Sequence, residues 1–164
     1  MNQLFTIGYE GAALEDFLGR LVRHRIQVLV DVRELAGSRR PGFSKSALSA
    51  ALSAAGIEYR HERALGSPRD IRHKLRADGN LQAFFRSFDA YLRTQTNVLE
   101  QLAETCMGNV ALMCFERDYT TCHRFSVARE LGRLADLVPV HMTVEHGPVR
   151  QTPRVHPRQG LPAA

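Results

Sequence analysis

The sequence predicts a three-layer α/β domain, in which a mostly parallel five-stranded sheet carries helices on both faces in a Rossmann-like or flavodoxin-like arrangement. Two observations predict this class. Short apolar runs alternate along the chain with longer segments whose apolar residues recur at helical spacing. Two of the runs, residues 28–30 and 110–113, are apolar at every position, which is typical of parallel strands buried on both faces.

The first third of the chain predicts three strands and two helices. The strands are expected at residues 4–9, 28–32 and 57–61. An amphipathic helix between the first two is indicated by the i, i+3, i+4, i+7, i+8 spacing of Leu14, Phe17, Leu18, Leu21 and Val22. Ser44 is the expected N-cap of an Ala-rich helix over residues 45–55, and Gly56 is its expected C′ residue.

The rest of the chain continues the alternation after an irregular segment. Residues 62–79 lack a clean period, and we expect a long basic loop there that could be partly helical. Asn80 should cap the next helix, whose apolar stripe comprises Leu81, Phe84, Phe85, Phe88, Tyr91 and Leu92. Asn97 and Glu100 resemble a capping pair for a further helix through Cys106. A fourth strand is expected at residues 110–115, a helix at residues 125–135 and a fifth strand at residues 138–144.

Length and composition place the chain among globular proteins. Its 164 residues suffice for one domain, which we assign to residues 1–145. Residues 146–164 are rich in Gly, Pro, Arg and Gln and predict an extended or mobile tail. No apolar run approaches the roughly 20 residues of a membrane span. Three cysteines and a start without a basic leader predict a cytoplasmic protein without a signal peptide.

Positive charge is concentrated in one part of the chain. The net charge is +5, and residues 38–76 hold nine Lys and Arg against three acids. Such a concentration predicts an anionic partner, either a phosphate-bearing small molecule or nucleic acid. The alternative is a solvated basic face without a partner.

A first group of candidate site residues follows the second predicted strand. Asp31 and Arg33 are two residues apart, so their side chains point to the same side and can meet one ligand or form a structural ion pair. Further candidates for anion binding lie just beyond, at Ser38, Arg39 and Lys45. Because ligands of parallel sheets bind beyond the carboxyl ends of the strands, these residues indicate a site there.

A second group follows the fourth predicted strand. If Thr120 or Thr121 caps the next helix, then Cys122, His123 and Arg124 occupy its first turn, where free N–H groups favour anions. Arg124 would then bind the anion, and Cys122 would be a nucleophile with a lowered pKa and His123 as its proton carrier.

Other interpretations of the second group remain open. Cys122 could pack as a small apolar residue. Cys114, Cys122 and His123 could bind a metal, but the chain has no C-x-x-C pair and no evident fourth ligand, so no metal site is predicted.

Carboxylates and a histidine at other strand ends complete the predicted site. Glu10, Asp31 and Glu116 could act as general acids or bases, or hold Mg²⁺ with a substrate phosphate. His61 ends the third predicted strand and is a candidate for substrate binding. We expect Asp31, Arg33, Arg39, Glu116, Cys122 and Arg124 to line one cleft.

Several motifs, in the same order, resemble the bacterial family called domain of unknown function 488. They are Thr6-Ile7-Gly8-Tyr9-Glu10-Gly11, Leu29-Val30-Asp31-Val32-Arg33, Ser38-Arg39-Arg40-Pro41-Gly42-Phe43-Ser44-Lys45, Gly56-Ile57-Glu58-Tyr59-Arg60-His61 with Leu65-Gly66, Leu112-Met113-Cys114-Phe115-Glu116 and Cys122-His123-Arg124. The resemblance covers about residues 4–142 and departs at residues 34–37, where the family pattern has a proline. It implies an α/β fold and a cytoplasmic setting, and it supplies no established activity.

Together these features favour an enzyme acting on a phosphate-bearing substrate, as a hydrolase or transferase of nucleotides or nucleic acid. The alternative is a non-catalytic module that binds nucleic acid or a protein partner through the same basic surface.

Overall fold

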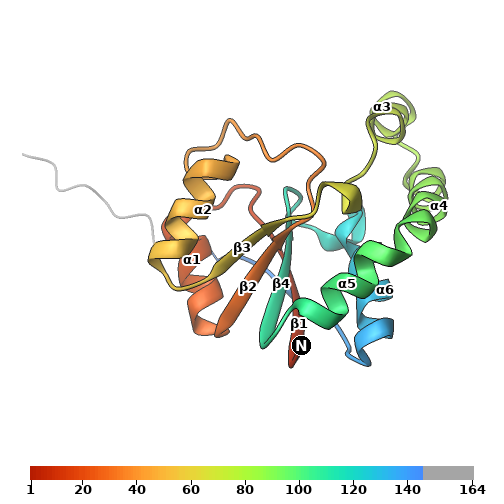
Figure 1. Ribbon diagram of the computed structural model, residues 1–164. Helices are drawn as coiled ribbons and strands as arrows, with labels where there is room; N and C mark the ends of the chain where they lie inside the picture. Colours follow the sequence, from red (N-terminus) through yellow and green to blue (C-terminus); the bar gives the residue numbers. More distant parts are fainter. Residues whose placement is uncertain (146–164) are drawn as a thin grey trace, which may run out of the picture.

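Five parallel strands form the centre of the molecule in the computed structural model, which describes residues 1–145 (Figure 1). The strands are β1 (Gln3–Gly8), β2 (Ile26–Asp31), β3 (Glu58–His61), β4 (Asn109–Cys114) and β5 (Val140–Met142). Helices pack on both faces of this sheet, so the predicted three-layer α/β class is confirmed. The tail predicted over residues 146–164 lies outside the described residues.

The strand order is β3-β2-β4-β1-β5, which differs from the 3-2-1-4-5 order of the Rossmann fold because β4 lies between β2 and β1. The register places Gly8 of β1 beside Cys114 of β4, and Asp31 of β2 beside Met113. The carboxyl ends of β1, β2 and β4 therefore lie side by side at one edge of the sheet, which is where the candidate residues of both groups begin.

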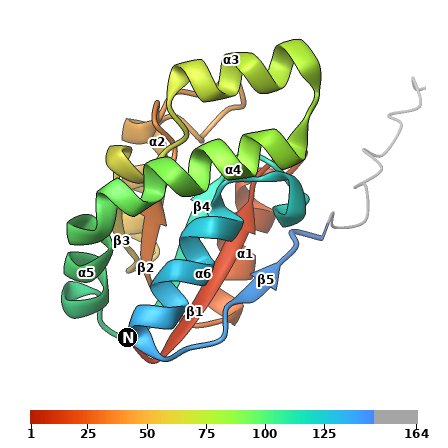
Figure 2. The ribbon, with the colours of Figure 1, turned by 90° about the vertical axis from the view of Figure 1, so that its right-hand side faces the viewer.

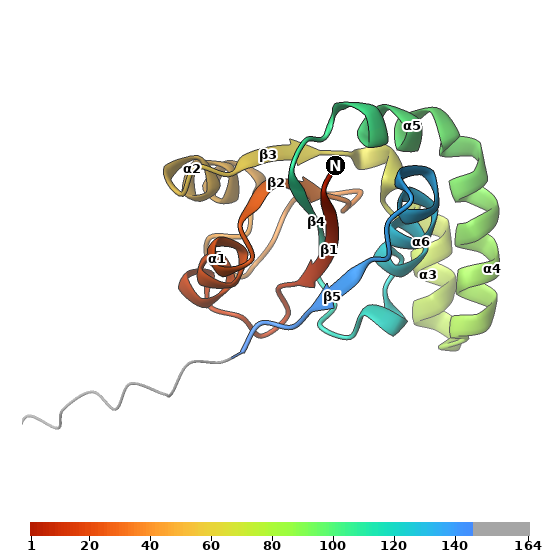
Figure 3. The ribbon, with the colours of Figure 1, turned by 90° about the horizontal axis from the view of Figure 1, so that it is seen from below.

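Each face of the sheet has its own apolar core. Helices α1 (Leu14–Arg23) and α2 (Lys45–Ala54) cover one face, where Phe17 and Leu48 are fully buried (Figure 3). Helices α4 (Leu81–Leu92), α5 (Thr96–Thr105) and α6 (Arg124–Ala135) cover the other face around Phe88 and Leu131. The chain adds strands first toward β3 and then in the opposite direction across the sheet. Because the crossovers are right-handed, this reversal places helices on both faces.

The segment predicted as a long loop contains a regular helix, α3 (Arg69–Asp78), after a short 3₁₀ turn over Arg63–Leu65. Pro68 precedes the helix, and Gly79, with a φ of +64°, ends it. The segment is therefore partly helical, as the prediction allowed. The position of the helix could not be predicted because α3 buries none of its residues, so its sequence carries no apolar stripe. Figure 2 shows α3 running beside α4, beyond the end of the sheet.

The predicted helix ends are partly correct. Ser44 and Asn80 are N-caps, and the Asn80 side chain accepts a hydrogen bond from the Ala83 N–H at 3.0 Å. The Asn97–Glu100 capping pair is wrong, because α5 begins at Thr96 directly after a 3₁₀ turn over Arg93–Gln95. Within residues 1–145, no helix has the length and apolar character needed to cross a bilayer.

Gly8 is required by the close approach of β1 to the segment after β4. A Cβ atom at this position would lie 1.8 Å from the carbonyl oxygen of Glu116, a backbone atom that cannot yield without moving the strand end. A Cβ atom on Gly19, within α1, would meet nothing within 4 Å.

We predict that Gly8→Ala lowers the free energy of unfolding by about 1–3 kcal/mol or more, as expected of overpacking. Gly19→Ala, the matched control, should raise it by about 0.5–1 kcal/mol because alanine favours the helix interior. Chemical denaturation of the two variants measures both values. Equal stability of Gly8→Ala and the wild-type protein would show that the two strand ends are not this close.

Candidate active site

A cleft of about 460 Å³ lies at the carboxyl edge of the sheet, between the ends of β1, β2 and β4 and the helices α3 and α4. Its polar lining includes Arg33, Arg72, Arg76, Cys114, Glu116 and His123. Its apolar lining includes Leu35, Leu75, Phe84 and Phe115. The volume lies within the range of small-molecule sites, about 300–1,000 Å³.

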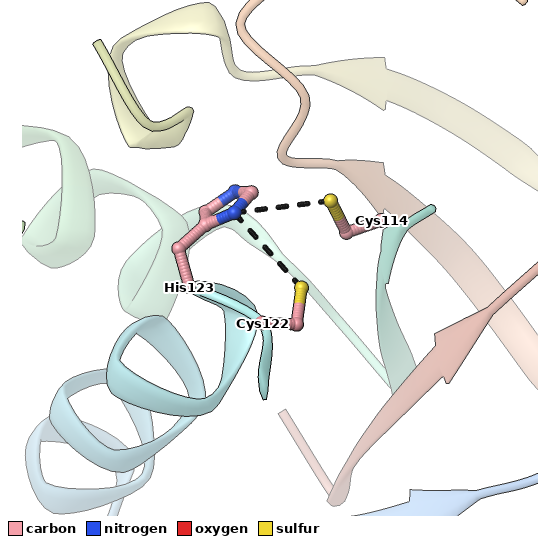
Figure 4. Close-up of side chains that lie close together, drawn as sticks. All are labelled: Cys114, Cys122 and His123. Carbon is pink, nitrogen blue, oxygen red and sulfur yellow. Dashed lines mark hydrogen bonds between the residues drawn. The ribbon is translucent and has the colours of Figure 1, made fainter. Parts of the chain in front are cut away.

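Two cysteines and a histidine gather at the inner end of this cleft (Figure 4). Cys114 ends β4, whereas Cys122 and His123 directly precede α6. The His123 Nδ1 atom lies 3.8 Å from the Cys114 sulfur and 3.9 Å from the Cys122 sulfur. All three side chains are buried, yet Cys114 and His123 belong to the wall of the cleft and Cys122 lies behind them.

A backbone contact orients the His123 ring. Its Nε2 atom lies 2.8 Å from the carbonyl oxygen of Val32, just after β2. A carbonyl oxygen can only accept, so Nε2 carries the hydrogen and the Nδ1 atom of the neutral ring presents its lone pair to the two sulfurs. The ring is thereby held in the orientation that a base or a metal ligand requires.

Glu116 extends this group toward the cleft. Its Oε2 atom accepts a hydrogen bond from the Cys114 thiol at 3.3 Å. Burial and the nearby Cys122 sulfur raise the pKa of Glu116 to about 7. The carboxyl group is therefore placed beside a sulfur and inside the cleft, as the sequence predicted for a strand-end acid.

The pKa values of the two thiols, Cys114 and Cys122, are shifted in opposite directions. Its hydrogen bond to Cys122, together with burial, raises the pKa of Cys114 well above its ordinary value. Burial alone would raise the pKa of Cys122, but the contacts with Cys114, His123 and Arg124 together lower it well below its ordinary value. Burial opposes the charged form of His123, and the neighbouring Cys122 sulfur outweighs it and raises the pKa of the imidazole. Negative charge in the group is thus favoured on Cys122.

Asp31 and Arg33 form a buried ion pair. The guanidinium donates to the two Asp31 oxygens from Nε at 2.9 Å and from Nη2 at 2.7 Å. Its Nη1 atom donates to the Tyr9 hydroxyl and to the Phe43 carbonyl oxygen. Asp31 is fully buried and does not line the cleft, so the structure corresponds to the structural alternative for this pair. Arg33 contributes to the cleft wall, with its donors already engaged.

Arg124 and the helix start differ from the prediction. Residues Tyr119–Thr121 form a 3₁₀ turn capped by Asp118, Cys122 is extended, and α6 begins only at Arg124. The Arg124 side chain is fully buried and donates to the carbonyl oxygens of Glu116 and Arg117. The expectation that Cys122 and His123 lie in the first helical turn, with Arg124 binding an anion, is therefore wrong. The helix starts later because the Asp118 side chain caps a separate turn.

The remaining candidates lie outside the cleft lining. Arg39 and Lys45 are exposed in and after the loop that follows β2. Ser38 accepts a hydrogen bond from the Arg40 N–H and holds that loop. The His61 ring contacts the Arg33 carbonyl oxygen at 2.8 Å, and Glu10 accepts a hydrogen bond from the Arg117 N–H.

The prediction that six residues line one cleft is correct for two of them, Arg33 and Glu116. The other four do not line it: Asp31, Arg39, Cys122 and Arg124.

Sequence reasoning missed the two arginines that α3 contributes. Arg72 and Arg76 lie one helical turn apart and both line the cleft. Arg72 is paired with Glu34 and also donates to the Ser67 carbonyl oxygen. Arg76 makes no hydrogen bond or ion pair with any residue from 1 to 145. The signal for both was the basic segment 38–76, but the sequence did not predict the helix Arg69–Asp78 that places them beside the cleft.

Comparison with known proteins agrees with the resemblance seen in the motifs. The family model described as Domain of unknown function DUF488 matches residues 13–131. The chain belongs to the DUF488 family. This DUF488 match contains the Asp31–Arg33 pair and the whole group of Cys114, Glu116, Cys122 and His123. No curated protein and no solved structure shows significant similarity to this DUF488 chain.

We predict that Arg33→Met lowers the free energy of unfolding by about 3–5 kcal/mol, because it leaves the Asp31 carboxylate buried without its counter-charge. Arg133→Met is the matched control. Arg133 is 69% exposed and pairs with Glu130 on the surface, so its loss should change stability by no more than about 0.5 kcal/mol. Denaturant titrations of both variants give the two values. A loss below about 1 kcal/mol for Arg33→Met would contradict a structural role.

Proposed function

We propose that this protein is an enzyme, a hydrolase or transferase, that acts on a phosphate-bearing small molecule such as a nucleotide in the cleft at the carboxyl edge of the sheet. One observation carries the proposal. The cleft has a sulfur, an imidazole and a carboxylate at its inner end, and its wall includes Arg76, which has no partner among residues 1–145.

The arginines of α3 support the anionic substrate. Arg76 has an uncompensated charge toward the cleft, and an arginine fork binds phosphate through two parallel hydrogen bonds. Arg72 stands one turn before it, already fixed by Glu34, and adds positive potential to the same wall. The apolar side chains Leu35, Phe84 and Phe115 offer a surface for the uncharged part of the substrate, such as a base or another ring.

The inner end of the cleft supports catalysis rather than binding alone. Cys114, Glu116 and His123 face a substrate bound against Arg76, and each residue type can transfer a proton or contact an electrophile. A purely binding surface has no need of a thiol, an imidazole and a carboxylate within contact of one another. Cys122 lies behind this wall, 1% exposed, so a direct attack by its sulfur is not part of the proposal.

Nucleic-acid binding is the rival function. Its support is the basic segment 38–76, but the structure divides these charges among separate elements. Arg60 pairs with Glu58 and Thr105 near α5, whereas Arg39 lies in the loop after β2. A cleft of about 460 Å³ fits a mononucleotide better than a duplex.

We predict that Arg76→Ala weakens binding of nucleoside monophosphates by about 10- to 100-fold, because a charged hydrogen bond contributes about 1.5–3 kcal/mol. Arg69→Ala is the matched control: the same residue type, exposed on the same helix and outside the cleft lining. Calorimetric titration with the four ribonucleoside monophosphates, and phosphate release from nucleoside di- and triphosphates, provide the two readouts. Equal effects of the two substitutions, or no binding of any of these probes, would overturn the proposed substrate class.

The rival function predicts a different pattern. A nucleic-acid-binding module should bind single- and double-stranded oligonucleotides with an affinity that falls steeply as salt rises. Arg39→Ala and Lys45→Ala should then weaken binding, whereas Glu116→Gln should not. Fluorescence anisotropy at two salt concentrations tests this pattern, and we expect the protein to bind mononucleotides in preference.

A further inference from the structure

We propose that Cys114, Cys122 and His123 form a zinc site whose fourth coordination position opens into the cleft. The inference deepens the proposed function and rests on it only for the role of the open position. Metal binding itself follows from the donor atoms and can be measured without a substrate.

The geometry of the three donors suits a tetrahedral ion. The two sulfurs and the His123 Nδ1 atom all lie within 4.8 Å of one another. Bonds of about 2.3 Å to sulfur and about 2.0 Å to nitrogen would put the nitrogen roughly 3.5 Å from each sulfur. The nitrogen-to-sulfur distances are 3.8 and 3.9 Å, so a shift of a few tenths of an ångström brings the nitrogen to the spacing that a shared ion requires from each sulfur.

The chemical state of the donors also suits zinc. Zinc binds cysteine sulfur and imidazole nitrogen and displaces their protons as it binds, so two cysteines and one histidine are suitable donor types. The His123 Nε2–H is already committed to the Val32 carbonyl oxygen, which is the outer contact that orients most metal-binding histidines. All three side chains are buried, so the donors are shielded from bulk solvent except on the side of the cleft.

The position of the cluster indicates a catalytic rather than a purely structural ion. Structural zinc sites use four protein ligands, whereas catalytic sites use three and keep one position for water or substrate. Two of the three donors here, Cys114 and His123, lie on the wall of the cleft, and Cys122 closes the site from behind. An ion held by them would therefore face the cleft. Its open position would take a water molecule or an oxygen atom of the bound anion, with the Glu116 carboxylate beside it.

The test uses the full chain, reduced and freed of metal, titrated with Co²⁺. We expect one Co²⁺ per chain, with the near-ultraviolet band of cobalt–thiolate bonds and the strong visible bands of a tetrahedral ion, and we expect Zn²⁺ to displace it. Cys114→Ser, Cys122→Ser and His123→Gln should each weaken binding by more than the roughly 10- to 100-fold typical of losing an outer contact. Cys106→Ser, which removes the buried cysteine outside the cluster, should leave the titration unchanged.

A second measurement avoids variants that fail to fold. In the wild-type protein, excess Zn²⁺ should slow alkylation of Cys114 and Cys122 by at least about tenfold and leave Cys106 unaffected. Absence of thiolate bands, unchanged spectra in Cys114→Ser and Cys122→Ser, or a Cys114–Cys122 disulfide in protein that takes up no metal after reduction would each overturn the zinc site. Arg76→Ala should bind Co²⁺ normally, because this arginine is not a metal ligand. Wild-type protein that shows the cobalt–thiolate spectrum but binds none of the nucleotide probes would overturn the proposed function and leave the metal site standing.

Discussion

The Asp31 carboxylate, wholly buried at the end of β2, accepts four hydrogen bonds, three from Arg33 and one from the Tyr59 hydroxyl. Arg33 in turn binds the Tyr9 hydroxyl after β1 and the Phe43 carbonyl oxygen before α2. A buried charge of this kind must keep its partners, because removing one leaves the other desolvated and unpaired. The pair therefore fixes the ends of β1, β2 and β3 and the loop before α2 relative to one another. The cleft walls depend on this arrangement, since Tyr9 and Arg33 both line it.

The elements with a strong period could be predicted from the sequence, and those held by tertiary contacts could not. The stripe from Leu14 to Leu21 and the apolar run before Cys114 gave a helix and a strand close to the observed ones, because burial imposes the period that the prediction uses. Val22, the last residue of the predicted stripe, is exposed. Helix α3 buries nothing and leaves no such pattern. The start of α6 was misplaced because the Asp118 side chain caps a preceding 3₁₀ turn and delays the helix to Arg124. Strand order was likewise beyond the sequence, since several parallel orders satisfy the same pattern of apolar runs.

The candidate site was predicted in its position and only partly in its members. Residues at strand ends were expected to converge, and Glu116, Arg33 and His123 do. The sequence leaves Asp31 open between a ligand-binding residue and a structural ion pair, and predicts Arg124 as an anion ligand, because charge in a sequence does not reveal whether it faces a cleft or a backbone carbonyl. No metal site is predicted from the sequence, which has no C-x-x-C pair and no evident fourth ligand. The 3₁₀ turn over Tyr119–Thr121 nevertheless brings Cys122, eight positions after Cys114, back beside it. The C-x-x-C rule describes two cysteines that share one turn of the chain, whereas Cys114 ends a strand and Cys122 and His123 directly precede a helix.

The insertion of β4 between β1 and β2 has a consequence for the order in which the chain can fold. Among the strands of the described residues, β1 pairs with β4 and β5 and with no other, so it has no neighbour in the sheet until Asn109–Cys114 has been synthesised. Before that point β2 can pair only with β3, and the first strand remains with both edges unsatisfied. Long-range parallel pairing of this kind slows folding, because the entropy of closing the loop is lost before the contacts form. Until β4 has been synthesised, the apolar strand Gln3–Gly8 therefore has open edges, which are the kind of surface that pairs with other chains.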